Sequence, residues 1–134
     1  MSHTAHSSRA GAPRRSRRAP KTPEGALLKL VLDYLAAEHI LAFRMNVLAM
    51  PTGDGKRFIK AGVPGMSDIL AFHGGTMQDG YAPYSMPIVP IWIELKAPKG
   101  KQSELQASFQ QQVEEHGHRY VLAYSLEDVK EALR

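Results

Sequence analysis

The fold of this chain is decided by Ile88–Lys96, with the sequence IVPIWIELK, in which every residue before Glu94 is apolar. Side chains of a strand alternate between its two faces, so a run that is apolar on both faces predicts a central strand covered on both sides. The same alternation places Glu94 and Lys96 on one face and Leu95 on the other. Charged side chains at the end of a buried strand need partners or a function.

A second carboxylate, Asp68, opens the apolar run Ile69–Phe72, 26 positions before Glu94. The turn-rich residues 62–67 lead into it, which predicts that Asp68 lies at the mouth of its strand. If the two strands pair near these ends, two carboxylates and the ammonium group of Lys96 converge. Two hard oxygen ligands beside a lysine predict a divalent-metal site with a cation left for phosphate or water, which is the chemistry of phosphodiester hydrolysis. The alternatives are an aspartate that caps the turn and a plain ion pair at the strand ends.

Capping residues and hydrophobic periodicity predict the remaining elements. The expected helices are 23–38, 103–116 and a last helix capped by Ser125; the expected strands are 41–47, 68–73, 89–96 and 119–124. The second helix begins with a capping-box signature, Ser103–Gln106. Residues 48–65 and 74–88 are rich in glycine and proline and predict two long loops. The order α-β-β-β-α-β-α predicts an α/β fold, a mixed sheet with flanking helices.

Composition sets the compartment and the number of domains. The 134 residues contain no cysteine, and no run approaches the roughly 20 apolar residues that a membrane span needs. No secretory signal opens the chain. We therefore expect a soluble intracellular protein that makes no contact with membranes and has neither disulfides nor thiolate zinc sites.

Positive charge is concentrated at the start of the chain. Residues 1–22 hold six Lys and Arg and no acid, whereas residues 23–134 hold eleven bases and thirteen acids. This pattern predicts a disordered basic tail at 1–22 and one folded domain at 23–134. Such a tail can bind the nucleic-acid backbone by releasing counterions, although a solvated leader and a targeting segment are alternatives.

Taken together, these motifs resemble the VRR-NUC family, the virus-type replication-repair nucleases of the PD-(D/E)xK nuclease superfamily. The resemblance covers nearly all of residues 23–134 and rests on Glu24, Phe43–Asn46, Gly62–Asp68, Trp92–Gly100 and Ser103–Gln106. The stretch from Glu94 to Gln106 is its most specific part. Ser67 departs from the superfamily, which usually has proline before the aspartate. That proline is not a ligand, so the departure affects only the local turn.

The resemblance implies a restriction-endonuclease-like fold and a site for Mg²⁺ or Mn²⁺. Asp68, Glu94 and the backbone carbonyl of Leu95 would bind the metal, and Glu24 would reach it directly or through water. Compensation of the helix dipole remains an alternative role for Glu24.

The resemblance also implies two residues that act on the substrate. Lys96 would orient or deprotonate the attacking water and counter the charge of the phosphate. Gln106 would lie beside this lysine and the scissile phosphate. A glutamine at the third helical position is also what a capping box requires, so this alternative stays open.

The implied function is that of a metal-dependent DNA endonuclease. By resemblance to stand-alone members, it would be structure-specific for branched DNA such as four-way junctions and would act as a homodimer in DNA repair. The expected location is the cytoplasm of a bacterial or phage-infected cell. A monomeric flap or nicking endonuclease and a non-catalytic DNA-binding module with the same fold are the alternatives.

Further residues could contact DNA outside the metal site. The candidates for the DNA backbone are Lys99 and Lys101 beyond the active strand, and Lys56, Arg57 and Lys60 before Asp68. Aromatic residues and methionine in loop 74–88 could stack on bases or pack against a second subunit, and the sequence does not decide between these roles. His116 and His118 flank Gly117 at a helix end. We expect these histidines to interact favourably with the helix dipole there rather than to bind a metal.

Overall fold

The computed structural model describes residues 22–45, 48–74 and 88–134, without the side chains of residues 48–51 and 58–61. In chain order the elements are α1 (Pro23–Ala37), β1 (Leu41–Arg44), β2 (Leu48–Pro51), β3 (Phe58–Ala61), β4 (Ile69–His73), β5 (Val89–Leu95), α2 (Glu104–Glu115), β6 (Arg119–Ala123) and α3 (Leu126–Ala132). The predicted α/β class and the predicted order of three helices and four sheet strands are confirmed. The basic tail and loop 74–88 lie almost wholly outside the described residues. No helix in the described part is long and apolar enough to cross a bilayer.

Helix ends follow the predicted capping residues. Thr22 accepts a hydrogen bond from the backbone of Gly25 at the start of α1. Ser103 and Ser125 each form a capping box at the start of α2 and α3. After α2, Gly117 adopts a φ of 81°, the left-handed conformation that glycine tolerates at a helix end.

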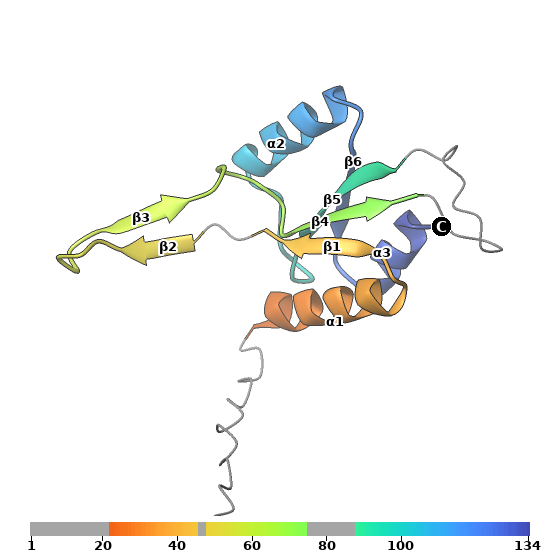
Figure 1. Ribbon diagram of the computed structural model, residues 1–134, viewed down its shortest axis with the longest axis horizontal. Coiled ribbons are helices and arrows are strands. Elements are labelled where there is room, and N and C mark those ends of the chain that lie inside the picture. The colour runs from red at the N-terminus through yellow and green to blue at the C-terminus, as the bar shows by residue number, and fades with distance from the viewer. Residues whose placement is uncertain (1–21, 46–47, 75–87) are drawn as a thin grey trace, which may run out of the picture.

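The main sheet has the strand order β1-β4-β5-β6. Strand β4 is antiparallel to both β1 and β5, whereas β5 and β6 are parallel. Parallel neighbours need a crossover, and α2 provides it. Figure 1 shows α2 on one side of the sheet and α1 on the other, with α3 packed beside α1. Strand β5 is therefore central, as its apolar sequence predicted.

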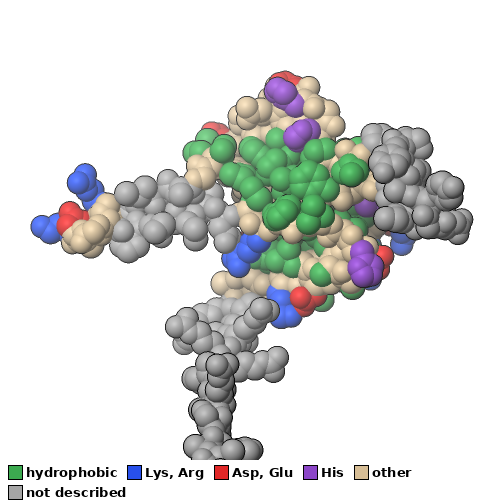
Figure 2. All heavy atoms as spheres, viewed as in Figure 1, with side chains coloured by type: hydrophobic (Ala, Val, Ile, Leu, Met, Phe, Trp, Pro, Cys, Tyr) green, Lys and Arg blue, Asp and Glu red, His purple; other side chains and the backbone are tan. Residues whose placement is uncertain are grey.

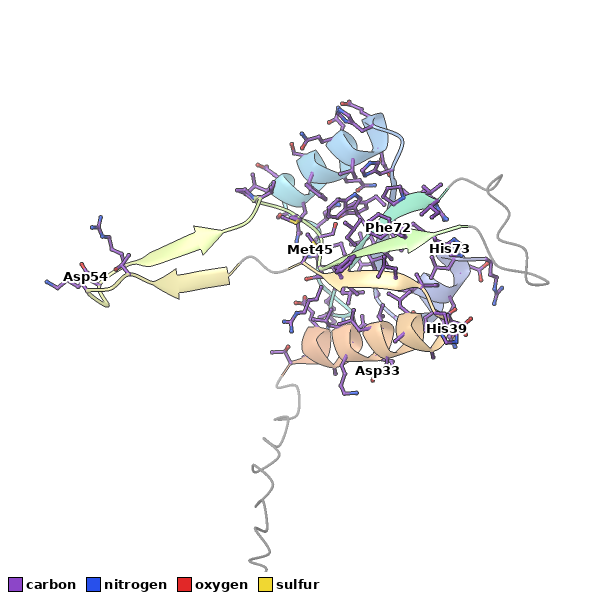
Figure 3. The ribbon with its side chains drawn as sticks, in the orientation of Figure 1. Asp33, His39, Met45, Asp54, Phe72 and His73 are labelled. Carbon is purple, nitrogen blue, oxygen red and sulfur yellow. The ribbon has the colours of Figure 1, made fainter. Side chains whose placement is uncertain are left out.

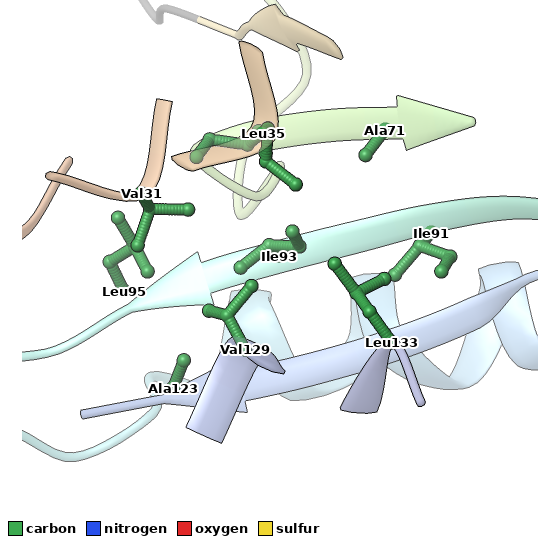
Figure 4. Close-up of a cluster of buried hydrophobic side chains, with 10 residues drawn as sticks. Val31, Leu35, Ala71, Ile91, Ile93, Leu95, Ala123, Val129 and Leu133 are labelled. Atoms are coloured by element: carbon green, nitrogen blue, oxygen red, sulfur yellow. The ribbon is translucent and has the colours of Figure 1, made fainter. Parts of the chain in front are cut away.

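The core lies between the sheet and the pair α1 and α3. Alternate residues of β5 face it, and Figure 4 shows them among side chains of both helices. Its fully or nearly fully buried members are Val31, Leu35, Ile69, Ala71, Ile91, Ile93, Leu95, Ala123, Val129 and Leu133. Each large aliphatic side chain buried in this way stabilises the fold by about 1.5–3 kcal/mol. The core thereby fixes β5, and with it the direction of the residues on the opposite face.

Residues 48–65 do not form a long loop as predicted, because a β-hairpin occupies most of this segment. Strands β2 and β3 pair in a separate two-stranded sheet. The turn is closed by the backbone bond from Thr52 to Arg57, and Gly55 within it has a φ of 68°. Two of the glycines that suggested a loop, Gly53 and Gly55, therefore lie in the hairpin turn. The hairpin extends away from the main sheet, with Asp54 at its tip (Figures 1 and 3).

Strand β1 ends at Arg44, whereas the predicted strand ran to Val47. Its last contact with the neighbouring strand is the bond from the Met45 backbone N–H to the Asp68 carbonyl, at 2.7 Å. This bond joins the chain leaving β1 to the residue just before β4, so β1 contributes to the position of Asp68.

Gly65 holds the turn before Asp68 against the first turn of α2. Its φ is 79°, and a Cβ added here would lie 2.3 Å from the carbonyl oxygen of Leu105 and 2.8 Å from the backbone nitrogen of Gln106. Only glycine allows this approach, because both neighbours are backbone atoms that cannot move independently.

We predict that Gly65→Ala destabilises the protein by more than 2 kcal/mol, roughly the cost of left-handed backbone plus that of a backbone clash. The matched control is Gly55→Ala, because Gly55 also has positive φ but has nothing within 4 Å of the added Cβ. The control should lose only about 1 kcal/mol. Urea unfolding measures both, and equal losses would show that the close approach to α2 is unimportant.

Candidate active site

The pairing of β4 with β5 brings the predicted carboxylates together. Ile69 lies opposite Ile93, so Asp68 lies next to Glu94 across the strand ends. Both aliphatic side chains are buried in the core, which fixes this register. The predicted convergence of Asp68, Glu94 and Lys96 is therefore present in the described structure.

Glu94 is the buried centre of the site. It is only 3% exposed, and its Oε1 atom lies 3.0 Å from the Nζ atom of Lys96. The same oxygen accepts a hydrogen bond of 2.6 Å from the side-chain amide of Gln106. A buried carboxylate is tolerated only when charge and hydrogen bonds compensate for lost water, and these two contacts provide both.

Gln106 forms the predicted capping box and also contacts the site through Glu94. Its side-chain oxygen accepts a bond of 2.8 Å from the backbone N–H of Ser103, and so completes the capping box. Its side-chain nitrogen donates to Glu94. The start of α2 is therefore attached to the site through a single amide group.

Asp68 binds the backbone of the residue that follows Glu94. Its Oδ2 atom accepts a bond of 2.8 Å from the N–H of Leu95. Nearby, Glu24 Oε1 accepts from the N–H of Ala97 at 3.3 Å, which brings α1 to the residue after Lys96. A pocket of about 210 Å³ opens here, lined by Thr22, Glu24, Gly25, Leu28, Arg44, Asp68 and Leu95. The predicted residues Glu24, Asp68 and Leu95 thus share one pocket, whereas Glu94 and Lys96 are not among the residues that line it.

The neighbouring carboxylate changes the protonation of Glu94. Burial and the charge of Asp68 together raise the pKa of Glu94 to about 7, against the opposing effect of Lys96. Burial also raises the pKa of Asp68, while the Leu95 N–H and Lys96 lower it. Two partly desolvated carboxylates beside each other need an added cation or a proton at neutral pH.

Arg44 is a site residue whose role the sequence did not indicate. It lines the pocket with Glu24 and Asp68, and its charge lowers the pKa of Asp68. The motif Phe43–Asn46 included it, but only the pairing of β1 with β4 places it beside Asp68. Among the described residues, no carboxylate forms an ion pair with Arg44.

The donor set of the pocket suits a magnesium ion. Within the part of the chain that the structure describes, no three His, Cys, Asp or Glu side chains are grouped closely enough to enclose a metal. Magnesium, however, is usually held by one or two carboxylates and otherwise by water and substrate phosphates. Asp68 and Glu24 in an open, polar pocket, with Glu94 adjacent, match that requirement.

Ser67, the residue just before Asp68, is fully buried, and its hydroxyl has no hydrogen-bond partner among the described residues. The hydroxyl lies near Tyr120, whose own hydroxyl accepts a bond of 3.1 Å from the Gln102 amide. Burial raises the pKa of Tyr120. The serine is thus a buried packing residue behind Asp68.

The predicted DNA-binding residues fall into two groups. Lys99 and Lys101 are exposed directly after β5, next to the site. Lys56 and Arg57 are exposed at the tip of the projecting hairpin and do not line the site pocket. Lys60 pairs with Ala49 in that hairpin, and its side chain lies outside the described part. The aromatic residues and methionine of loop 74–88 also lie outside the described part of the chain; they are Tyr81, Tyr84 and Met86.

Comparisons of the chain with protein-family models, with curated proteins and with solved structures gave no significant match. The family, the restriction-endonuclease-like fold and the activity are therefore proposals that rest on the residues and their geometry.

We predict that folding stability without metal falls as the pH rises from about 4.5 to about 7. In this range an unfolded Glu94, with a pKa of 4.5, has released its proton while the folded group, with a pKa of about 7, retains it. The loss for this group is about 3 kcal/mol. Glu94→Gln cannot titrate and should flatten the profile, as measured by urea unfolding in chelator. Glu127→Gln, on the surface of α3, is the control; an unchanged slope in Glu94→Gln would refute the assignment.

Proposed function

We propose that this protein is a metal-dependent DNA endonuclease that hydrolyses phosphodiester bonds. The observation that carries the proposal is the pair Asp68 and Glu94, two partly desolvated carboxylates placed side by side with the half-buried Lys96. This arrangement costs stability in the absence of a cation, and such costs are typical of functional sites.

Each residue of the site has a role in the proposed reaction. Asp68, Glu94 and Glu24, with the backbone carbonyl of Leu95, would hold Mg²⁺ or Mn²⁺. A divalent ion lowers the pKa of water and offsets charge on the phosphate. Lys96 uses one of its three N–H groups for Glu94, which leaves donors for the attacking water or a phosphate oxygen. Lys96 is thereby held by the same carboxylate that would bind the metal.

Gln106 and Arg44 support this chemistry in different ways. Gln106 holds Glu94 in place from α2, and so acts on the orientation of a proposed ligand. Arg44 offers a guanidinium group at the pocket, where it suits a phosphate oxygen of the substrate. Exposed Lys99 and Lys101 next to the site would hold the flanking backbone of the DNA.

The family and the substrate follow from the resemblance to VRR-NUC nucleases. The four-stranded mixed sheet with helices on both sides supports a restriction-endonuclease-like fold. In this family, stand-alone members resemble junction-cleaving enzymes, which makes branched DNA the proposed substrate and a homodimer the proposed state. A monomeric flap or nicking endonuclease is the second candidate within the same chemistry.

A non-catalytic DNA-binding module is the competing class. It would hold DNA equally well with magnesium or with chelator and would never cut it. Every residue that the proposed chemistry requires is present in this chain, which favours the enzyme. A structural protein is a third class, in which the acids pair only internally and added magnesium leaves the melting temperature unchanged.

We predict that the protein cuts a labelled four-way junction in magnesium and that Lys96→Ala lowers the rate at least about 100-fold, because positioned proton transfer contributes that much. The matched control is Lys130→Ala, which removes another ion-paired lysine, on α3. Flap, splayed and linear substrates belong in the same assay. A cut flap beside an intact junction would overturn the substrate but not the nuclease. Wild-type cutting by folded Lys96→Ala would overturn the mechanism.

We further predict that Gln106→Ala and Ser103→Ala separate the two roles of the glutamine. Both break the capping box and should lose about 1 kcal/mol of stability in urea unfolding. Only Gln106→Ala also frees Glu94, so it alone should lower the cleavage rate, by about 10- to 100-fold. Equal rates for the two variants would show that the bond to Glu94 does not matter for activity.

A further inference from the structure

A second pocket lies on the side of the sheet that carries α2. Its volume is about 380 Å³, and it is lined by Val63, Phe109, Gln112, Val113, His116 and His118. Phe109 forms one wall and packs edge-on against Trp92 of β5, with ring centroids 5.0 Å apart. Figure 2 shows hydrophobic side chains gathered on this face below histidines of the same region. The proposed nuclease chemistry uses none of these residues.

The two histidines that line this pocket differ in the hydrogen-bonding character of their rings. His118 Nδ1 accepts the indole N–H of Trp92 at 2.9 Å, so in the neutral ring the proton sits on Nε2, which is a donor. His116 Nδ1 lies 2.7 Å from the Gln112 carbonyl and must donate to it, so its neutral Nε2 is an acceptor. The lining therefore contains one histidine donor and one histidine acceptor, and the side-chain amide of Gln112 adds both kinds of group.

The chemistry of the lining selects an uncharged, flat ligand. None of the six lining residues is Lys, Arg, Asp or Glu, so the lining has no permanently charged side chain to select an ionic ligand. Aromatic and aliphatic walls with a few donors and acceptors suit the face and the edge of a nucleobase. The volume lies within the usual range for small-ligand sites, about 300–1,000 Å³.

The position of the pocket relates it to the proposed cleavage site. Trp92 and Glu94 lie two residues apart on β5 and therefore on the same face of the sheet. Gln106 at the start of α2 bonds to Glu94, and Val113 in the pocket lies seven residues further along the same helix. Seven residues span about 10 Å, which is about three steps of a stacked DNA strand. The pocket therefore lies about three nucleotide steps along α2 from the contact of Gln106 with Glu94.

We propose that this pocket receives an unpaired nucleobase of the DNA substrate, within about three nucleotides of the bond that is cut. The inference rests on the proposed nuclease function and adds to it a contact with a base rather than with the backbone. Such a contact favours substrates in which a base near the cut is already unstacked, because extruding a paired base costs energy. An apolar surface of a partner protein is the competing occupant.

An abasic scan tests the proposal. Branched substrates carry one abasic nucleotide at successive positions around the cut, and their affinity is measured by fluorescence anisotropy in Ca²⁺, with cleavage measured in Mg²⁺. We expect one position at which loss of the base weakens binding about tenfold, the effect of a single stacked base. The double variant Val63→Ser/His116→Ala changes only exposed residues of the lining and should reduce this effect to less than about twofold. The control is Leu30→Ser, at an exposed leucine of α1, and this variant should retain the tenfold effect of the abasic nucleotide.

Three other results would overturn the inference. Cleavage with no position-specific abasic effect, or with the same effect in the double variant, would refute the base pocket and leave the nuclease assignment intact. A change of oligomeric state in the double variant, without any abasic effect, would assign the surface to protein contacts instead. Failure to bind and cut any DNA would overturn both the inference and the proposed function.

Discussion

The burial of the Glu94 carboxylate is the constraint on which the site depends. A carboxylate that is 3% exposed must be compensated, and its partners come from two parts of the chain: Lys96 just beyond β5 and Gln106 on α2. Asp68, from the start of β4, adds a second charge nearby instead of relieving the first. The site thus combines firm positioning with an unbalanced negative charge, the combination that a cation would complete.

Features encoded over a few residues could be predicted from the sequence. Alternation in Ile88–Lys96 gave the central strand and the shared face of Glu94 and Lys96, and the capping serines gave the starts of α2 and α3. Both signals depend only on local backbone geometry. The convergence of Asp68 with Glu94 required one further assumption, the pairing of two apolar strands near their ends, and that assumption was correct.

Features that depend on contacts between distant segments could not be predicted. The position of Arg44 beside Asp68 follows from the register of β1 on β4, and the contact of Glu24 with Ala97 joins residues 73 positions apart. The double role of Gln106 appears only when α2 is placed against β5. The hairpin of β2 and β3 was missed for another reason: glycines that close a tight turn have the same composition as a loop.

The most direct test of the central claim is a manganese titration followed by electron paramagnetic resonance at pH 8, above the pKa of about 7 for Glu94. If Asp68 and Glu94 are poised for a hard cation, the wild-type protein binds Mn²⁺ at a site that Asp68→Asn and Glu94→Gln each abolish, while Glu127→Gln retains it. Wild-type protein that leaves manganese free in solution, or binding that survives both substitutions, would contradict the account.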